Sequence, residues 1–220
     1  DEVTKLQKTA VMKAQSFYWG FPLVAPPEIK LKGIEGHLQN EFGISGCGFI
    51  VFPRGISEIY NPRLTVEIVK GLLKNGVKNK IIIFKGFSSG NDELSFSKLL
   101  SGLDVYYVNR LLDEDELYSI YTRCDFHFSN PKSDSLGGGV VEPAQLGSIP
   151  VLNNIPPYQK YLESNEGILL RDYDEEGIAQ LSNLIKDKGS RTSTLPENFS
   201  LTGVVTSFKD MFNKILANYE

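Results

Sequence analysis

The stretch DSLGGGVVEPAQLGSIPVLNN, residues 134–154, places three consecutive glycines between an aspartate and an apolar run. Within it, residues 140–147 predict a helix that stops at Gly147, and residues 148–154 predict a strand. Consecutive glycines let backbone N–H groups approach a ligand closely, and the helix adds the positive end of its dipole. The stretch therefore suits a phosphate cradle, and it suits a tight turn with close helix packing equally well.

The segments around this stretch alternate between strand and helix patterns. β-branched or aromatic runs bounded by Gly, Asn or Pro predict strands at residues 48–53, 80–86, 103–108, 124–130, 148–154 and, as an edge strand, 166–171. Helical patterns lie between them at residues 62–76, 91–102 and 113–124. This alternation predicts an α/β fold with a Rossmann-like, mostly parallel sheet and helices on both faces. Ligands bind beyond the carboxyl ends of such strands, where the glycine loop is expected to lie.

The pattern divides the chain into three parts. Residues 46–187 carry the alternation and are predicted to form the Rossmann-like domain. Residues 1–45 fit it poorly and are interpreted as a lead-in from a preceding N-terminal domain, with residues 17–33 as a linker or strand. Residues 188–220 are expected to form a C-terminal loop and an amphipathic closing helix over residues 204–220.

Composition and charge exclude several classes of function. The chain has 220 residues, 41% of them hydrophobic, which is enough to bury a core. A net charge of -4 without runs of Lys or Arg argues against nucleic acid as a partner. Cys47 and Cys124, without metal-ligand spacing, indicate neither a disulfide framework nor a metal site and are expected to be buried. We expect a cytoplasmic protein, and peripheral membrane association of a full-length protein is left open.

Residues 134–151 resemble the donor-site motif of the retaining GT-B glycosyltransferases, the glycosyl transferases group 1 family. That motif usually has Glu-Gly-Phe-Gly, a short apolar run, Glu-Ala, Gly, and then a small residue followed by Pro-Val. The matching residues here are Asp134, Leu136, Gly137, Val140, Val141, Glu142, Ala144, Gly147, Pro150 and Val151. The likeness covers about residues 46–187 and implies one half of a GT-B fold, the C-terminal half that binds the nucleotide-sugar.

The resemblance implies catalytic-site roles for two acids. Asp134 matches the first acid of the motif and would face the sugar of the donor, although a glutamate is commoner at that position. Glu142 matches the second acid and would hydrogen-bond the ribose hydroxyls of the nucleotide. Glu142 also has a simpler interpretation, because an acid near the start of a helix is favoured by the helix dipole alone.

The resemblance also implies a phosphate site without a metal ion or cofactor, because backbone donors and basic side chains neutralise the phosphate charge. Arg54 would contact the diphosphate, and the alternative for it is an ordinary surface cation. Lys132 would replace a lysine of the family that is missing after Arg54. The other expected contacts are the amides of Leu136, Gly137, Gly138 and Gly139 for phosphate, and the segment with Val108, Arg110 and Leu111 for the base.

The function implied is the donor-binding part of a glycosyltransferase that moves a sugar from a nucleoside-diphosphate sugar to an acceptor with retention. The acceptor, a glycan, a lipid or a protein, would be bound by a missing N-terminal domain, so this chain alone is expected to be inactive. The alternative is a non-catalytic interaction or regulatory module, which Asp134 and the missing lysine favour. A GT-B-type epimerase would need a general acid or base, for which His37 and His127 offer little.

Overall fold

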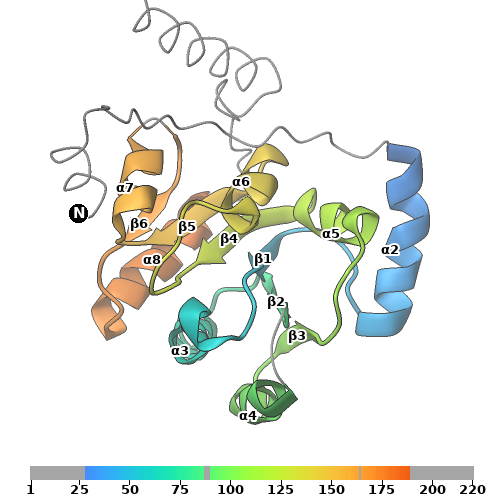
Figure 1. The fold of residues 1–220 in the computed structure, drawn as a ribbon, viewed down its shortest axis with the longest axis horizontal. Helices are drawn as coiled ribbons and strands as arrows, with labels where there is room; N and C mark the ends of the chain where they lie inside the picture. The colour runs from blue at the N-terminus through green and yellow to red at the C-terminus, as the bar shows by residue number, and fades with distance from the viewer. Residues whose placement is uncertain (1–27, 87–89, 164, 189–220) are drawn as a thin grey trace, which may run out of the picture. The chain divides into compact units, whose positions relative to one another are not determined.

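The computed structural model describes residues 28–86, 90–163 and 165–188, all of which lie in a compact unit formed by Leu23–Pro196 (Figure 1). Its elements are α2 (Glu28–Phe42), β1 (Phe49–Phe52), the 3-10 helix η1 (Glu58–Tyr60), α3 (Pro62–Lys74), β2 (Lys80–Phe84), α4 (Gly90–Leu100), β3 (Val105–Val108), α5 (Glu114–Tyr121), β4 (Cys124–Ser129), α6 (Gly138–Gln145), β5 (Ile149–Asn153), α7 (Pro156–Leu162), β6 (Ile168–Leu170) and α8 (Glu175–Lys188). The predicted alternation of strands and helices is confirmed.

The six strands form one parallel sheet in the order β3-β2-β1-β4-β5-β6, with β6 at an edge as predicted. The chain starts in the middle of the sheet at β1, runs outward to β3, and then returns to place β4 on the other side of β1. The strand order therefore reverses between β1 and β4. In open α/β sheets, ligands bind beyond the carboxyl ends of the strands at this reversal.

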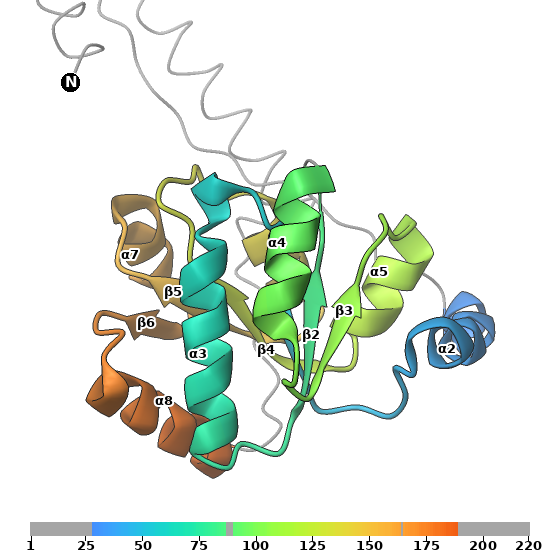
Figure 2. The same cartoon turned by 90° about the horizontal axis from the view of Figure 1, so that it is seen from below.

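Helices cover both faces of the sheet, as Figures 1 and 2 show. On one face, Ile50 and Phe126 pack in a buried cluster with side chains from α3, α4 and α8. On the other, Phe49 and Val51 pack with side chains from α2 and α5. Near the carboxyl ends of β1 and β4, Phe52 and Phe128 stack with ring centroids 4.6 Å apart. The two strands that flank the reversal are thereby fixed from within the core.

The structure corrects two expectations. Residues 28–33, interpreted as part of a linker or strand, begin α2, which is anchored by Leu38 against the cluster that includes α5. Among the side chains of α2 that the structure describes, the apolar contacts recur every fourth residue at Ile34, Leu38 and Phe42, a narrow stripe that gives only a weak helical signal in the sequence. Cys47 is exposed, whereas Cys124 is buried as expected.

Two further points concern the ends of the chain and the membrane. The closing helix predicted for residues 204–220 lies outside the described residues. Within the described ranges, no helix combines the length and apolar character that a membrane crossing requires. The sheet and the loops that follow β1, β2 and β4 position the candidate site.

Candidate functional site

The loops after β1 and β4 meet at the strand-order reversal. Arg54 follows β1, and the loop after β4 carries Asp134 and leads into α6, whose N-cap is Gly137. Leu136 turns this loop with a left-handed backbone, φ 65°, and buries its side chain. Gly137 has no side chain, and no side-chain hydrogen bond caps the N-terminus of α6. Backbone N–H groups at such a terminus are anion-binding groups.

Arg54 packs directly against this helix N-terminus. A Cβ atom added to Gly137 would lie 3.2 Å from Arg54 Nη1, and one added to Gly139 would lie 3.1 Å from Nε and from Cδ. Gly137 and Gly139 therefore allow the close approach of Arg54, whereas the turn itself is made at Leu136. On its other side, the guanidinium lies over the ring of Tyr60, 5.5 Å from its centroid.

Arg54 is also part of a closed polar network that we call the strand-end cluster, formed by Arg54, Ser129, Asp134 and Tyr158. Arg54 Nε donates to Ser129 Oγ at 3.2 Å, and Nη2 pairs with Asp134 Oδ2. Tyr158, from α7, donates its hydroxyl to the same Oδ2 at 2.5 Å and lies 2.7 Å from Ser129 Oγ. The side chains of Arg54 and Asp134 are 15% and 12% exposed, so this pair is well shielded from water.

Burial keeps the Tyr158 hydroxyl of the cluster protonated. Tyr158 is fully buried, and burial together with its hydrogen bond to Asp134 raises the pKa of Tyr158 far above its usual value. The hydroxyl therefore keeps its proton and donates at neutral pH. The sequence patterns did not single out Ser129 or Tyr158, although both complete the cluster.

Glu142 is the fifth residue of α6, and its side chain reaches back toward the N-terminus of the helix. A Cβ atom added to Gly138 would lie only 2.5 Å from Glu142 Oε1, so the carboxylate folds back over the first turn of α6. Burial and the nearby charge of Glu114 raise the pKa of Glu142, and the charge of Arg54 opposes that rise. The structure thus brings Glu142, Arg54 and the glycine run together.

The second predicted cation, Lys132, stands at the edge of this site. Its side chain pairs with Glu58 of η1, and its backbone N–H donates to the carbonyl of Ile59 at 2.8 Å. The loops after β1 and β4 are thereby tied together. Lys132 already has a carboxylate partner, and its side chain is 49% exposed. Water therefore screens the charge of Lys132 more than that of Arg54, and we expect Lys132 to attract a bound anion less strongly.

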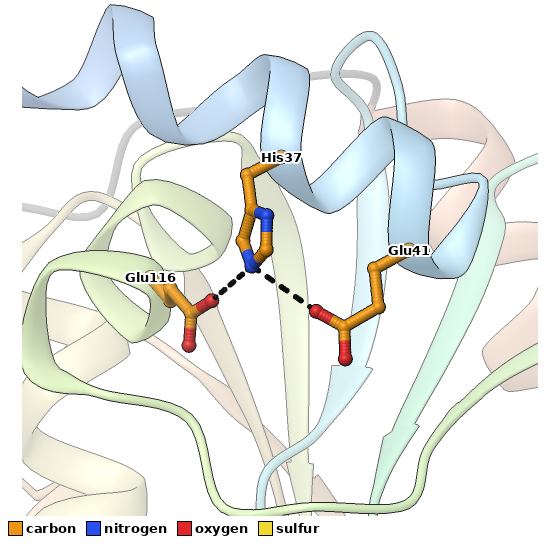
Figure 3. Close-up of side chains that lie close together, drawn as sticks. All are labelled: His37, Glu41 and Glu116. Atoms are coloured by element: carbon orange, nitrogen blue, oxygen red, sulfur yellow. Dashed lines mark ion pairs between the residues drawn. The ribbon is translucent and has the colours of Figure 1, made fainter.

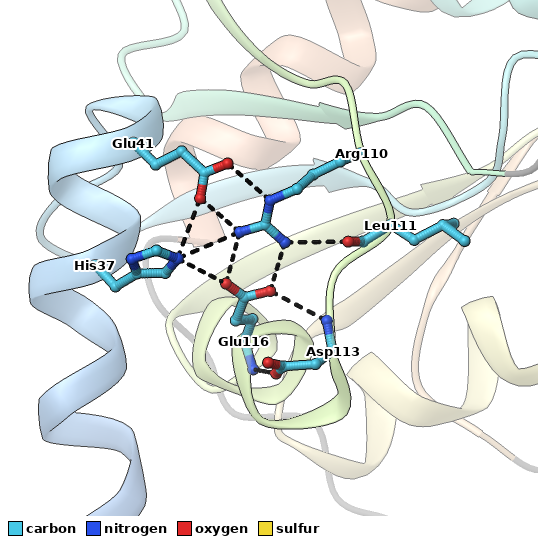
Figure 4. Close-up of polar contacts among 6 residues, drawn as sticks. All are labelled: His37, Glu41, Arg110, Leu111, Asp113 and Glu116. Atoms are coloured by element: carbon cyan, nitrogen blue, oxygen red, sulfur yellow. Dashed lines mark hydrogen bonds and ion pairs between the residues drawn. The ribbon is translucent and has the colours of Figure 1, made fainter.

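The predicted base-binding segment lies at the carboxyl end of β3, which β2 separates from β1. Val108 ends β3 in the core, its carbonyl accepts from the N–H of Lys85 at 2.9 Å, and Leu111 is 53% exposed. The side chain of Arg110 is engaged elsewhere, between α2 and α5 (Figure 4). The segment can therefore offer backbone groups and Leu111, while the Arg110 guanidinium has a structural role.

Arg110 binds two carboxylates at once. It donates from Nε to Glu41 Oε1 and from Nη1 to Glu116 Oε2, both at 2.7 Å, and its Nη2 lies 2.5 Å and 2.7 Å from their other oxygens (Figure 4). His37 Nε2 lies 3.1 Å from Glu41 Oε2 and 3.3 Å from Glu116 Oε1 (Figure 3). His37, Glu41 and Glu116 place potential metal-ligand atoms within 4.8 Å of one another, but the Arg110 guanidinium already donates hydrogen bonds to both carboxylates.

This network predicts a specific acid sensitivity. The hydrogen bonds from Arg110 lower the pKa of Glu116 below its ordinary value of 4.5. A carboxylate with a lowered folded-state pKa stabilises the fold above its unfolded pKa, and that contribution disappears as the pH falls below about 4.5. We expect Arg110→Gln to reduce the free energy of unfolding by about 1–2 kcal/mol at pH 7, because the buried Glu116 loses its partner. Urea denaturation at pH 7 and pH 3.5 measures both effects.

A control variant isolates the role of burial. Lys74→Gln breaks the pair between Lys74 and Glu175, whose side chains are 71% and 80% exposed, and should leave stability unchanged. Arg110→Gln should also flatten the acid dependence. An Arg110→Gln protein that loses as much stability between pH 7 and pH 3.5 as the parent would contradict the role assigned to this network.

Comparisons with known proteins give fold likeness but no sequence match. No protein-family model matches the chain, and no curated protein sequence matches it. A glycosyltransferase from Rickettsia africae ESF-5 superposes with a TM-score of 0.71 at 16% identity, over 99% of this chain and 62% of that one. Anabaena Alr3699/HepE, solved in complex with UDP-glucose, gives a TM-score of 0.68 at 14% identity, over 93% and 58% of the two chains.

The trehalose-6-phosphate synthase OtsA is a third match, with a TM-score of 0.57 at 16% identity, over 93% of this chain and 48% of that one. This chain has the fold of a GT-B glycosyltransferase domain. The expectation of an α/β, Rossmann-like domain of GT-B type is thus confirmed. The chain spans 58%, 62% and 48% of the lengths of the HepE, Rickettsia and OtsA structures, respectively, so it corresponds to only part of each.

Proposed function

We propose that this chain is the donor-binding part of a glycosyltransferase that moves a sugar from a nucleoside-diphosphate sugar to an acceptor. The observation that carries the proposal is the position of Arg54 against the N-terminus of α6, where the strand order reverses. A guanidinium and a helix N-terminus are two independent anion-binding groups, and here they converge. The UDP-glucose bound to the similar HepE structure supports a donor of this class.

The chemistry follows from where charge develops in such a transfer. As the bond to the sugar breaks, the leaving diphosphate gains negative charge, and pre-organised donors at that position lower the barrier. Arg54 and the amides of Gly138 and Gly139 would supply this stabilisation without a metal ion or cofactor. Glu142 would hold the ribose, and Asp134 would face the donor sugar.

Three finer points belong to the same proposal. Transfer would proceed with retention of configuration at the sugar. The acceptor, a glycan, a lipid or a protein, would be held by a domain outside this chain, so this chain alone would not complete the reaction. We place the protein in the cytoplasm, where nucleoside-diphosphate sugars would be its substrates.

The alternative, a non-catalytic binding or regulatory module, is favoured by one observation. Arg54 pairs with Asp134 and Lys132 pairs with Glu58, so both predicted phosphate-binding cations already have carboxylate partners. A diphosphate must compete with these acids for the basic side chains. A site that no longer binds a ligand would show the same pairing of its basic side chains with nearby carboxylates.

Calorimetric titration with UDP, GDP and ADP distinguishes the two functions. We expect saturable binding of one nucleotide and about tenfold weaker binding by Glu142→Ala, the loss that follows from removing hydrogen bonds worth about 1.4 kcal/mol. Glu176→Ala, an exposed acid on α8, is the matched control and should bind as the parent does. Failure of all three nucleotides to bind would overturn the donor-site proposal and favour the module.

A further inference from the structure

The strand-end cluster contains a residue for which the proposed donor site has so far given no role. Tyr158 is anchored on α7, is fully buried, and directs its hydroxyl at Asp134 Oδ2 from 2.5 Å. Asp134 itself lies on a loop in which Lys132, Ser133 and Ser135 are exposed. The carboxylate is therefore held mainly by what its side chain contacts.

Two donors share the Oδ2 atom of Asp134, and they differ in what a ligand would do to them. Arg54 is charged, and a bound diphosphate would draw on its guanidinium. Tyr158 is fully buried, so a phosphate in the site does not reach its hydroxyl, which stays directed at Asp134. Ser129, at the end of β4, fixes the Tyr158 hydroxyl from its other side at 2.7 Å. Tyr158 is thus the contact that would persist if Arg54 turned to a ligand.

We propose that Tyr158 is a positioning residue of the donor site, which holds the Asp134 carboxylate in place for the sugar while Arg54 binds the diphosphate. This inference rests on the proposed function. Tyr158 touches Asp134 and not the reacting atoms, so its influence passes through Asp134. It should therefore affect a nucleotide that carries a sugar and spare the nucleotide alone.

The test compares UDP with UDP-glucose by calorimetry on the 220-residue chain and on Tyr158→Phe, which removes one hydroxyl and keeps the buried ring. We expect the affinity for UDP-glucose to fall about fivefold to tenfold, the loss typical of one hydrogen bond to a charged group, and the affinity for UDP to stay within about twofold. Tyr161→Phe, a buried tyrosine on the same helix, is the control and should leave both affinities within about twofold.

A double variant tests whether the effect passes through Asp134. In an Asp134→Ala background, Tyr158→Phe should have no further effect on UDP-glucose binding, because its target is absent. Equal losses for UDP and UDP-glucose, losses that add to those of Asp134→Ala, or unchanged UDP-glucose binding by Tyr158→Phe would each overturn the inference. A parent protein that binds none of UDP, GDP, ADP and UDP-glucose would instead overturn the proposed function, which separates the two failures.

Discussion

Arg54→Ala should weaken nucleoside-diphosphate binding about 100-fold, equivalent to about 2.7 kcal/mol. Arg54 is the basic side chain that the structure places against the N-terminus of α6, where it is 15% exposed. Charge-assisted hydrogen bonds in such a shielded position are roughly twice as strong as neutral ones. Removing the guanidinium also leaves Asp134 as an uncompensated negative charge that repels the phosphates. Calorimetric titration with the nucleotide that the parent binds measures the loss.

Two further variants show what this loss depends on. Arg54→Lys keeps the charge but not the planar fork that reaches Ser129 and Asp134 together, so we expect an intermediate loss of about tenfold. Arg63→Ala removes an exposed cation on α3 and should leave the affinity unchanged. Circular dichroism would confirm that each variant is folded. An Arg54→Ala protein that binds within threefold of the parent would place the anion site elsewhere.

The fold and the glycine loop of the candidate site could be predicted from the sequence because their signals are local. β-branched runs such as residues 80–84 identify buried parallel strands, and the glycine run marks a loop that leads into a helix. The pairing of Arg54 with Asp134 was not accessible in this way, since 80 residues separate them. Only the return of the chain from β3 to β4 brings their loops together.

The role of Tyr158 could not be predicted from sequence patterns at all. It follows two prolines, which suggest a loop, yet these prolines occupy the first turn of α7, where their missing N–H groups are harmless. Its hydroxyl partners are contributed by β4 and by the loop after it. No spacing within residues 156–162 encodes those partners, because packing across the sheet sets them. Arg110 is the converse case, a predicted ligand residue whose partner Glu41 comes from the segment interpreted as a lead-in.

Gly86→Ala should lower the free energy of unfolding by about 3 kcal/mol, the sum of backbone strain and a backbone clash. Gly86, in the loop after β2, has φ 59°, in the left-handed region that disfavours a side chain. A Cβ atom there would lie 2.6 Å from Gly55 Cα and 3.0 Å from Gly55 N. These are main-chain atoms, so no rotamer change relieves the contact, and the loop that carries Arg54 must shift. Urea denaturation measures the loss.

Gly76→Ala is the matched control for Gly86→Ala, because it has the same strain without the clash. Gly76 follows Asn75, the C-cap of α3, with φ 75°, and a Cβ atom there meets nothing within 4 Å, so we expect a loss of only about 1 kcal/mol. The two variants should also differ in function. Displacing Gly55 moves Arg54, so Gly86→Ala should weaken nucleotide binding, whereas Gly76→Ala should not. Equal stability losses with unchanged binding in both would show that the loop after β2 does not hold Arg54 against α6.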